Sequence, residues 1–190
     1  MVTWTARRIR HILLLVAAIV SFGANGTGAS AERATVVASS PADVAIADWA
    51  LARYAAAGLE LPPVTIVFHD DPASCADNSG LYRSFRIDAC LGGQTLAYAR
   101  RTLVHELAHA WSEAHLLPED QARFLELRGL RTWNSKAVPW VERGFEQAAE
   151  VLTWGVGERT TRILLPDRDR PDELAVAFET LTGRQALPEV

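Results

Sequence analysis

The stretch at residues 102–115, TLVHELAHAWSEAH, constrains the fold of this chain more than any other. It contains the pattern HExxH, from His105 to His109, inside a segment with helical periodicity. A spacing of four residues places both imidazoles on one face of a helix, one turn apart, where they can share one tetrahedral ion. Glu106 lies about 100° around the helix from His105. Its carboxylate can therefore reach a water on that ion without binding the ion itself.

These residue types at this spacing suit zinc chemistry. Neutral imidazole nitrogens bind Zn²⁺, and the ion lowers the pKa of a bound water to about 7. A nearby carboxylate can then accept the proton of that water. The sequence therefore predicts a Zn²⁺ site with His105 and His109 as metal ligands and Glu106 as the catalytic general base. The alternative is an amphipathic helix that carries two histidines by chance.

The N-terminal segment has the pattern of a secretory signal peptide. Three arginines at positions 7, 8 and 10 precede the apolar residues 12–20, and small residues lead to the sequence Ala-Ser-Ala at 29–31. The apolar run is far shorter than the roughly 20 residues that span a bilayer, although an uncleaved anchor is the alternative. We therefore predict a signal peptide at 1–31, a secreted protein (extracellular or in the cell envelope), and one domain at 32–190.

Charge and cysteine content narrow the function further. Cleavage would remove three arginines and no acid, which changes the formal net charge from −4 to −7. An acidic chain without a basic stripe argues against nucleic-acid binding, and no later segment is long enough for a membrane span. Cys75 and Cys90 are the only cysteines, and in an oxidising compartment we expect them to form a disulfide. Closing this loop contributes roughly 3 kcal/mol to stability, a structural role.

The pattern along the chain predicts a small sheet followed by helices. We expect a flexible lead at 32–40, a helix at 41–57, a strand at 64–68 and a half-exposed edge strand at 81–89. Helices are expected at 95–114, 118–129, 139–154 and 171–182. This order predicts an α+β fold with a small antiparallel or mixed sheet, an active-site helix and further C-terminal helices. The edge strand could bind an extended peptide, or its arginines could simply protect the edge from aggregation.

A catalytic zinc has three protein ligands, and two residues compete for the third position. His115 completes the outline HExxHxxxxxH, but the chain would have to turn sharply after His109. A left-handed residue at Ser112, where glycine normally makes that turn, would cost roughly 1–2 kcal/mol. The other candidate is Glu146, which shares a helix face with Glu150, four residues later, and with Arg143. Gly144 would let this helix approach another one closely.

The sequence HELAH followed by EQAAE at 146–150 resembles the gluzincins, zinc peptidases whose third ligand is a glutamate. The resemblance covers roughly residues 94–155. It implies a zincin-like fold, with Glu146 as the third zinc ligand and Glu150 as an acid that accepts a hydrogen bond from His105. Metzincins, which use the His115 outline, carry a Met-turn, whereas the only methionine here is Met1.

These features predict a secreted zinc metallopeptidase that cleaves a peptide or protein substrate with metal-activated water. Alternatives are a catalytically inactive zincin-like binding protein, a metzincin-like site with His115 as third ligand, and a helical domain with an accidental motif. The negatively charged oxygen that forms during such a reaction needs a further hydrogen-bond donor. Spacing does not choose among the candidates, which are Tyr82, Tyr98, His115 and Arg143.

Overall fold

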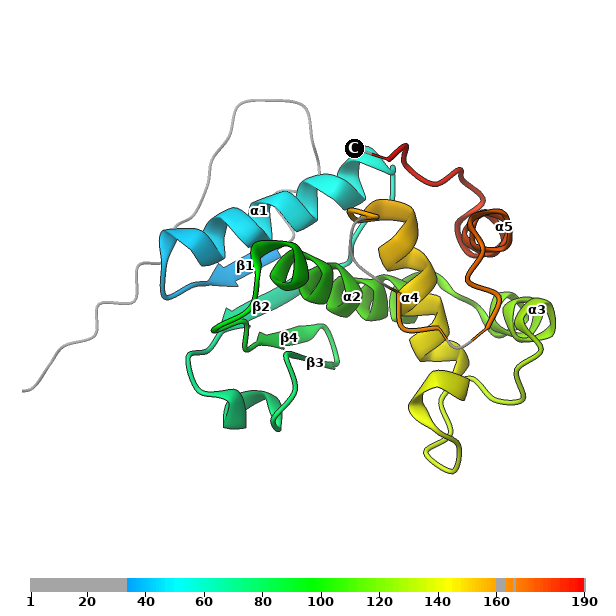
Figure 1. Ribbon diagram of the computed structural model, residues 1–190, viewed down its shortest axis with the longest axis horizontal. Helices are drawn as coiled ribbons and strands as arrows, with labels where there is room; N and C mark the ends of the chain where they lie inside the picture. The colour runs from blue at the N-terminus through cyan, green and yellow to red at the C-terminus, as the bar shows by residue number, and fades with distance from the viewer. Residues whose placement is uncertain (1–33, 160–162, 166, 190) are drawn as a thin grey trace, which may run out of the picture.

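The computed structural model describes residues 34–159, 163–165 and 167–189. The expected signal peptide at 1–31 lies outside these residues. The chain forms, in order, β1 (Ala34–Val37), α1 (Pro41–Ala56), β2 (Val64–Phe68), η1 (Pro72–Cys75), β3 (Gly80–Arg83), β4 (Arg86–Ala89), α2 (Leu96–His115), α3 (Pro118–Arg128), η2 (Trp140–Glu142), α4 (Gly144–Val156) and α5 (Pro171–Thr182) (Figure 1). A small mixed sheet with helices confirms the predicted α+β class.

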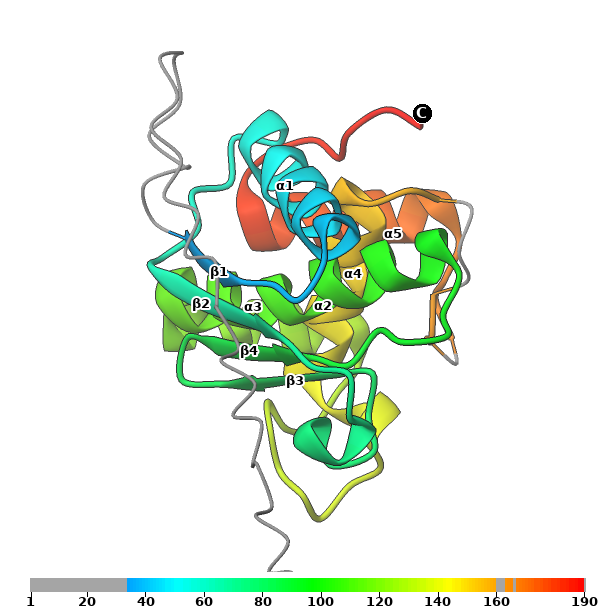
Figure 2. The ribbon, with the colours of Figure 1, turned by 90° about the vertical axis from the view of Figure 1, so that its left-hand side faces the viewer.

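The described strands form one sheet in the order β1-β2-β4-β3 (Figure 2). Strands β1, β2 and β4 run parallel, and β3 runs antiparallel to β4. The expected flexible lead at 32–40 was wrong, because its β-branched residues 35–37 form β1 and pair with β2. The lead had too few residues for a periodicity to be visible, and only pairing with β2 makes it a strand.

The expected single edge strand at 81–89 was also wrong, because the segment folds back on itself as a hairpin. Ser84 and Phe85 take positive φ angles of 45° and 64° and form a two-residue turn between β3 and β4. Such turns usually carry Asn or Gly, so this sequence gave no signal for one. As a consequence β4 is an inner strand, and β3 forms the edge of the sheet opposite β1, in contact with α2.

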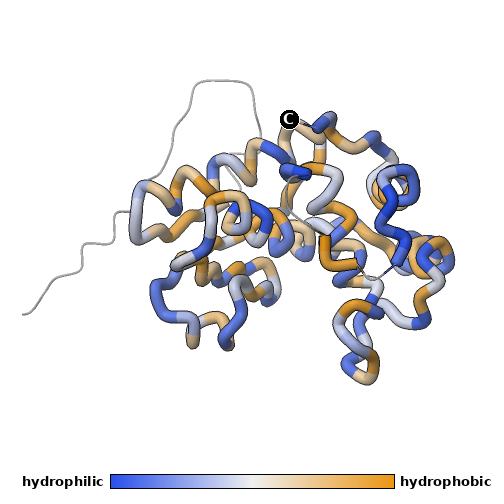
Figure 3. Tube along the Cα trace, viewed as in Figure 1, coloured by the Kyte–Doolittle hydropathy of each residue, from blue (hydrophilic) through white to orange (hydrophobic). Residues whose placement is uncertain are grey.

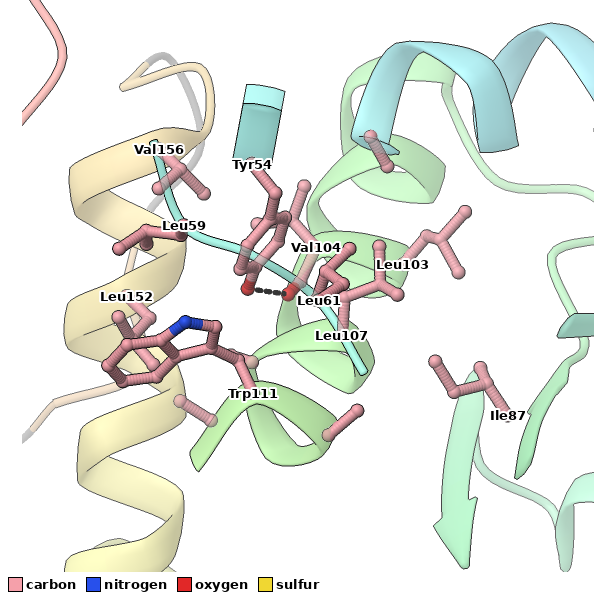
Figure 4. Packing of buried hydrophobic residues seen from close by; sticks show 14 of the residues in the cluster. Tyr54, Leu59, Leu61, Ile87, Leu103, Val104, Leu107, Trp111, Leu152 and Val156 are labelled. Carbon is pink, nitrogen blue, oxygen red and sulfur yellow. Dashed lines mark hydrogen bonds between the residues drawn. The ribbon is translucent and has the colours of Figure 1, made fainter. Parts of the chain in front are cut away.

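Helix α2 lies between the sheet and α4, so it has little freedom to move (Figure 1). It begins after Thr95, whose hydroxyl accepts a hydrogen bond from the Tyr98 amide. Leu103 and Leu107 on α2 are fully buried in the core. The hydroxyl of the buried Tyr54 on α1 donates to the Val104 carbonyl at 2.9 Å (Figure 4). These contacts hold α2, and with it the HExxH pattern, in place.

Hydrophobic segments gather where α2 meets α4, whereas the segment leading into α5 is strongly hydrophilic (Figure 3). The last helix is placed as expected, with its stripe of Leu174, Ala177, Phe178 and Leu181 buried. None of the described helices is long and apolar enough to cross a membrane.

Helix α4 begins later than expected. We predicted a helix from position 139, but η2 is followed by Arg143 in extended conformation. The amides of Gly144 and Phe145 donate to the carbonyls of Thr132 and Trp133 at 3.0 and 2.8 Å. Because these amides bond to the connector between α3 and η2 (residues 129–139), the α-helix starts at Gly144.

The expectation that a helix approaches closely at Gly144 is confirmed, although the neighbours are α3 and the connector. A Cβ atom at Gly144 would lie 2.6 Å from Leu125 Cδ2 and 2.7 Å from Trp133 Cε3.

The predicted disulfide between Cys75 and Cys90 is confirmed. It ties η1 to the residue after β4, and the Cys90 amide donates to the Ser79 carbonyl at 2.9 Å. The disulfide therefore anchors the loop that leads into β3.

Candidate metal centre

Helices α2 and α4 bring three donor side chains together. The Nε2 atoms of His105 and His109 lie 3.5 and 3.2 Å from the same oxygen, Oε2 of Glu146. One donor atom from each of the three residues lies within 4.8 Å of the other two. Both histidines are buried, and Glu146 is partly buried. This cluster could bind a metal ion, and it consists of the residues that we predicted as ligands.

Glu150 lies directly behind His105. Its Oε1 is 3.0 Å from His105 Nδ1, on the side of the ring opposite Glu146. The carboxylate is fully buried, and its Oε2 accepts a hydrogen bond from the Leu164 amide at 2.8 Å. Arg101 Nη2 donates to both oxygens of Glu150 at 2.5 and 2.6 Å. Glu150 therefore has three partners, which are Arg101, the Leu164 amide and His105. The predicted hydrogen bond from His105 is present only as a close contact, because His105 Nδ1 makes no hydrogen bond of regular geometry.

Arg101 was not identified from the sequence as the partner of Glu150, because Arg143 shares a predicted helix face with Glu146 and Glu150. Arg143 instead donates from Nε and Nη2 to the Val138 carbonyl, each at 3.3 Å. Arg101 precedes His105 by four residues, and His105 precedes His109 by four, so the three share one helix face. An arginine on the same buried face as the motif is the signal that could have identified it.

The charges in this cluster shift the pKa values of its members in the metal-free chain. Burial lowers the pKa of His105, but its contacts with Glu146 and Glu150 outweigh burial and raise the value to about 9. Burial raises the pKa values of Glu146 and Glu150, but their charged partners outweigh burial and lower both values to about 2. These partners are His105 and His109 for Glu146, and His105 and Arg101 with the Leu164 amide for Glu150. The two carboxylates are therefore ionised and available as ligand and hydrogen-bond acceptor at neutral pH.

Aromatic rings fix the orientation of the two imidazoles. Phe145 stacks on His109 with ring centroids 4.2 Å apart, and Trp140 stacks on His105 at 5.9 Å. The Nδ1 atoms of both histidines are buried, and neither makes a hydrogen bond of regular geometry to a described residue, although Glu150 Oε1 lies 3.0 Å from His105 Nδ1. His109 is thus positioned mainly by stacking, whereas His105 also has the carboxylate of Glu150.

The cluster opens into a cavity of about 490 Å³ between β3, α2, η2 and α4. Glu106 lines this cavity together with the three donor residues. Its side chain lies against the start of β3, where a Cβ atom at Gly80 would come within 2.6 Å of Glu106 Oε1. The carboxylate predicted as general base is therefore beside the cluster and outside it, as the helical geometry of HExxH requires.

The remaining candidates lie in different places. Helix α2 continues without a break to His115, whose Nε2 lies 2.7 Å from the Glu60 carbonyl, away from the cluster. Tyr82 lines the cavity, but its hydroxyl donates to Glu113 on α2 at 2.8 Å. Tyr98 and Arg143 also line the cavity. The structure thus joins Glu146, and not His115, to the two histidines.

Comparison with known proteins adds no relative: no family model, curated protein or solved structure matched the chain. The interpretation of the site therefore depends on its geometry and chemistry.

Proposed function

We propose that this protein is a zinc metallopeptidase with a zincin-like fold, exported by the signal peptide at 1–31. One observation supports it above all: the distances from Glu146 Oε2 to the two Nε2 atoms are 3.5 and 3.2 Å. Ligands about 2.0–2.1 Å from a tetrahedral zinc lie roughly 3.3 Å from one another. Two nitrogens and one carboxylate oxygen also form a usual ligand set for catalytic zinc, with the fourth position open for water.

The resemblance to the gluzincins gives each residue a role. Zn²⁺ bound by His105, His109 and Glu146 would polarise the substrate carbonyl and acidify the attacking water. Glu106 accepts the proton of that water and later delivers it to the leaving nitrogen. Glu150 keeps the Nδ1 proton of His105 in place, so that Nε2 presents its lone pair to the metal.

The free edge of β3 supplies a binding surface for an extended peptide. Arg83 and Arg86 lie opposite each other next to the two-residue turn, where the backbones of an antiparallel hairpin form a hydrogen-bonded pair. Along the strands, pairs with and without backbone hydrogen bonds then alternate. Gly80 and Tyr82 fall on non-bonded pairs, so their N–H and C=O groups point away from β4 toward the free edge. Residues 78–82 line the cavity. A peptide that pairs with this edge would pass beside Glu106.

Metal analysis of the mature protein tests the proposal. We expect one zinc ion per wild-type chain, loss of that ion in His105→Ala and Glu146→Ala, and retention in His115→Ala. Glu106→Gln should keep zinc but lose hydrolysis of a mixed peptide library by a factor of about 100 or more.

Three outcomes would contradict the proposal in whole or in part. If His115→Ala loses zinc while Glu146→Ala retains it, the ligand assignment is wrong. If zinc-loaded Glu106→Gln cleaves at the wild-type rate, the proposed general base is wrong. Stoichiometric zinc without any hydrolysis by the wild type would indicate a binding protein on the same scaffold.

A further inference from the structure

The carboxylates that line the cavity all have a task already. Glu146 lies between the two histidines, and Glu150 accepts from Arg101 and Leu164. Glu106 is the third carboxylate in the lining, and the proposed function uses it as the base. The described lining therefore offers no carboxylate to a positively charged substrate side chain. A basic side chain next to the cut bond would thus find no free carboxylate in the described lining of this cavity.

The two arginines in the lining differ in what they bind. Arg101 is buried, and its Nη2 contacts both oxygens of Glu150. Arg143 is only partly buried and has no carboxylate partner among the described residues. Its Nε and Nη2 share one neutral acceptor, the Val138 carbonyl, at 3.3 Å each. The charge of Arg101 is thus neutralised within the protein, and the charge of Arg143 is not.

Arg143 also lies close to where the chemistry would occur. Arg143 comes three residues after Trp140, whose ring stacks on His105. It comes two residues before Phe145 and three before the ligand candidate Glu146. Phe145 stacks on the other histidine at 4.2 Å. Arg143 therefore lines the same cavity as the three donor residues, and a group that binds to it would share this cavity with the cut bond.

We propose that the cavity selects peptides with a carboxylate within two residues of the cut bond, and that Arg143 binds this carboxylate. The inference rests on the proposed function. The planar guanidinium of arginine suits a carboxylate better than any other group in a peptide, because two parallel N–H bonds can form. Two sources supply this group: an Asp or Glu side chain, or the free carboxyl terminus of a peptide cut near its end.

The test uses zinc-loaded protein and matched peptide pairs. One set of pairs differs only in Glu versus Gln at each of the two positions on either side of the cut bond. Another pair differs only in a free versus an amidated carboxyl terminus. Each pair is measured with wild type, Arg143→Gln, Arg143→Lys and Arg131→Gln. Arg131 is an exposed arginine in the connector between α3 and η2, and its side chain does not line the cavity.

We expect wild type to prefer the carboxylate member of one pair by roughly tenfold to hundredfold in kcat/KM. Arg143→Gln should reduce this ratio to about 1, Arg143→Lys should retain part of it, and Arg131→Gln should leave it unchanged. Which pair shows the preference identifies the source: the side chain or the carboxyl terminus. The zinc content and melting temperature of each variant separate loss of recognition from loss of structure.

Binding affinities for the two peptides of each pair are also measured, with zinc-loaded Glu106→Gln and with the double variant Glu106→Gln/Arg143→Gln. The ratio of these affinities does not depend on turnover. A ratio near 1 in wild type, or an equal ratio in Arg143→Gln, would overturn the inference while leaving the proposed function intact. Absence of hydrolysis with a carboxylate preference in binding that depends on Arg143 would contradict the peptidase activity alone. Absence of binding to any of the peptides would overturn the inference.

Discussion

At the scale of single residues, the two imidazoles of the cluster are held by different forces. His105 lies 3.0 Å from the buried carboxylate of Glu150, which Arg101 neutralises. Among the described residues no carboxylate lies at ion-pair distance from His109 Nδ1, and the ring of His109 stacks on Phe145. A change to the buried charges should therefore act on the metal through His105.

Arg101→Met is expected to weaken zinc binding by about tenfold. Without Arg101, the fully buried carboxylate of Glu150 loses its cation and tends to take up a proton, so it no longer orients His105. Competitive titration with a chromophoric chelator measures this. Arg100→Met is the matched control, since Arg100 is adjacent on α2 but pairs with Glu158 away from the cluster.

Arg101→Lys should recover part of the zinc affinity, because it retains the charge. If Arg101 acts through Glu150, Arg101→Met should have little further effect in a Glu150→Gln background. Equal zinc affinities of wild type, Arg101→Met and Arg100→Met would show that the ion pair between Arg101 and Glu150 has only a structural role.

At the scale of elements, β3 and α2 meet at the proposed base. β3 begins at Gly80, directly after a loop that is held at two points. One is the Cys75–Cys90 disulfide, and the other is the hydrogen bond from the Cys90 amide to the Ser79 carbonyl. The Glu106 side chain occupies the space that a side chain at residue 80 would need. The edge strand leaves room for Glu106, and in the proposed function it also presents its free backbone groups to a peptide.

Gly80→Ala should therefore reduce hydrolysis and leave zinc binding nearly intact. Its Cβ would lie 2.6 Å from Glu106 Oε1 and 2.7 Å from Cγ, so the carboxylate or the strand must move. A misplacement near 1 Å can reduce the rate by about 100-fold. The measurement is kcat together with zinc content. Gly92→Ala is the control, because a Cβ there meets no atom within 4 Å; equal rates for the two variants would disprove the positioning role.

At the scale of the whole molecule, we expect metal binding and folding to be linked, because the cluster joins α2 to α4. In the metal-free protein the pKa of His105 is raised from 6.5 to about 9, so the folded chain holds a proton that the unfolded chain releases. This contribution to the free energy of unfolding is complete below pH 6.5 or so and is lost as the pH rises through about 9. Zinc must displace the same proton, so its affinity rises over this range.

Thermal unfolding from pH 6 to 9 should therefore show opposite trends. With a chelator present, stability should fall as the pH rises, by no more than about 3 kcal/mol. The affinity for zinc should increase by up to tenfold per pH unit over the same range, because one proton is displaced. The stabilisation that excess zinc adds should therefore increase with pH. His105→Ala should abolish both trends. Parallel stability curves with and without zinc would contradict the linkage.

The sequence by itself determined the local features of this protein. The four-residue spacings in HExxH and in EQAAE each define one helix face, and helix periodicity follows from backbone geometry alone. For this reason the α+β class and the two helix faces, one with His105 and His109 and the other with Glu146 and Glu150, could be predicted. That the two faces meet was implied only by the resemblance to the gluzincins. The pairing of the only two cysteines needed no spatial information either.

Only the tertiary structure decided which distant groups meet. Arg101, and not Arg143, neutralises Glu150, because α4 begins at Gly144 and directs Arg143 toward Val138. The segment expected as one strand became a hairpin, since Ser84 and Phe85 accept positive φ angles without a turn signature. Such contacts depend on packing between elements far apart in the chain, and no periodicity within a single segment records them.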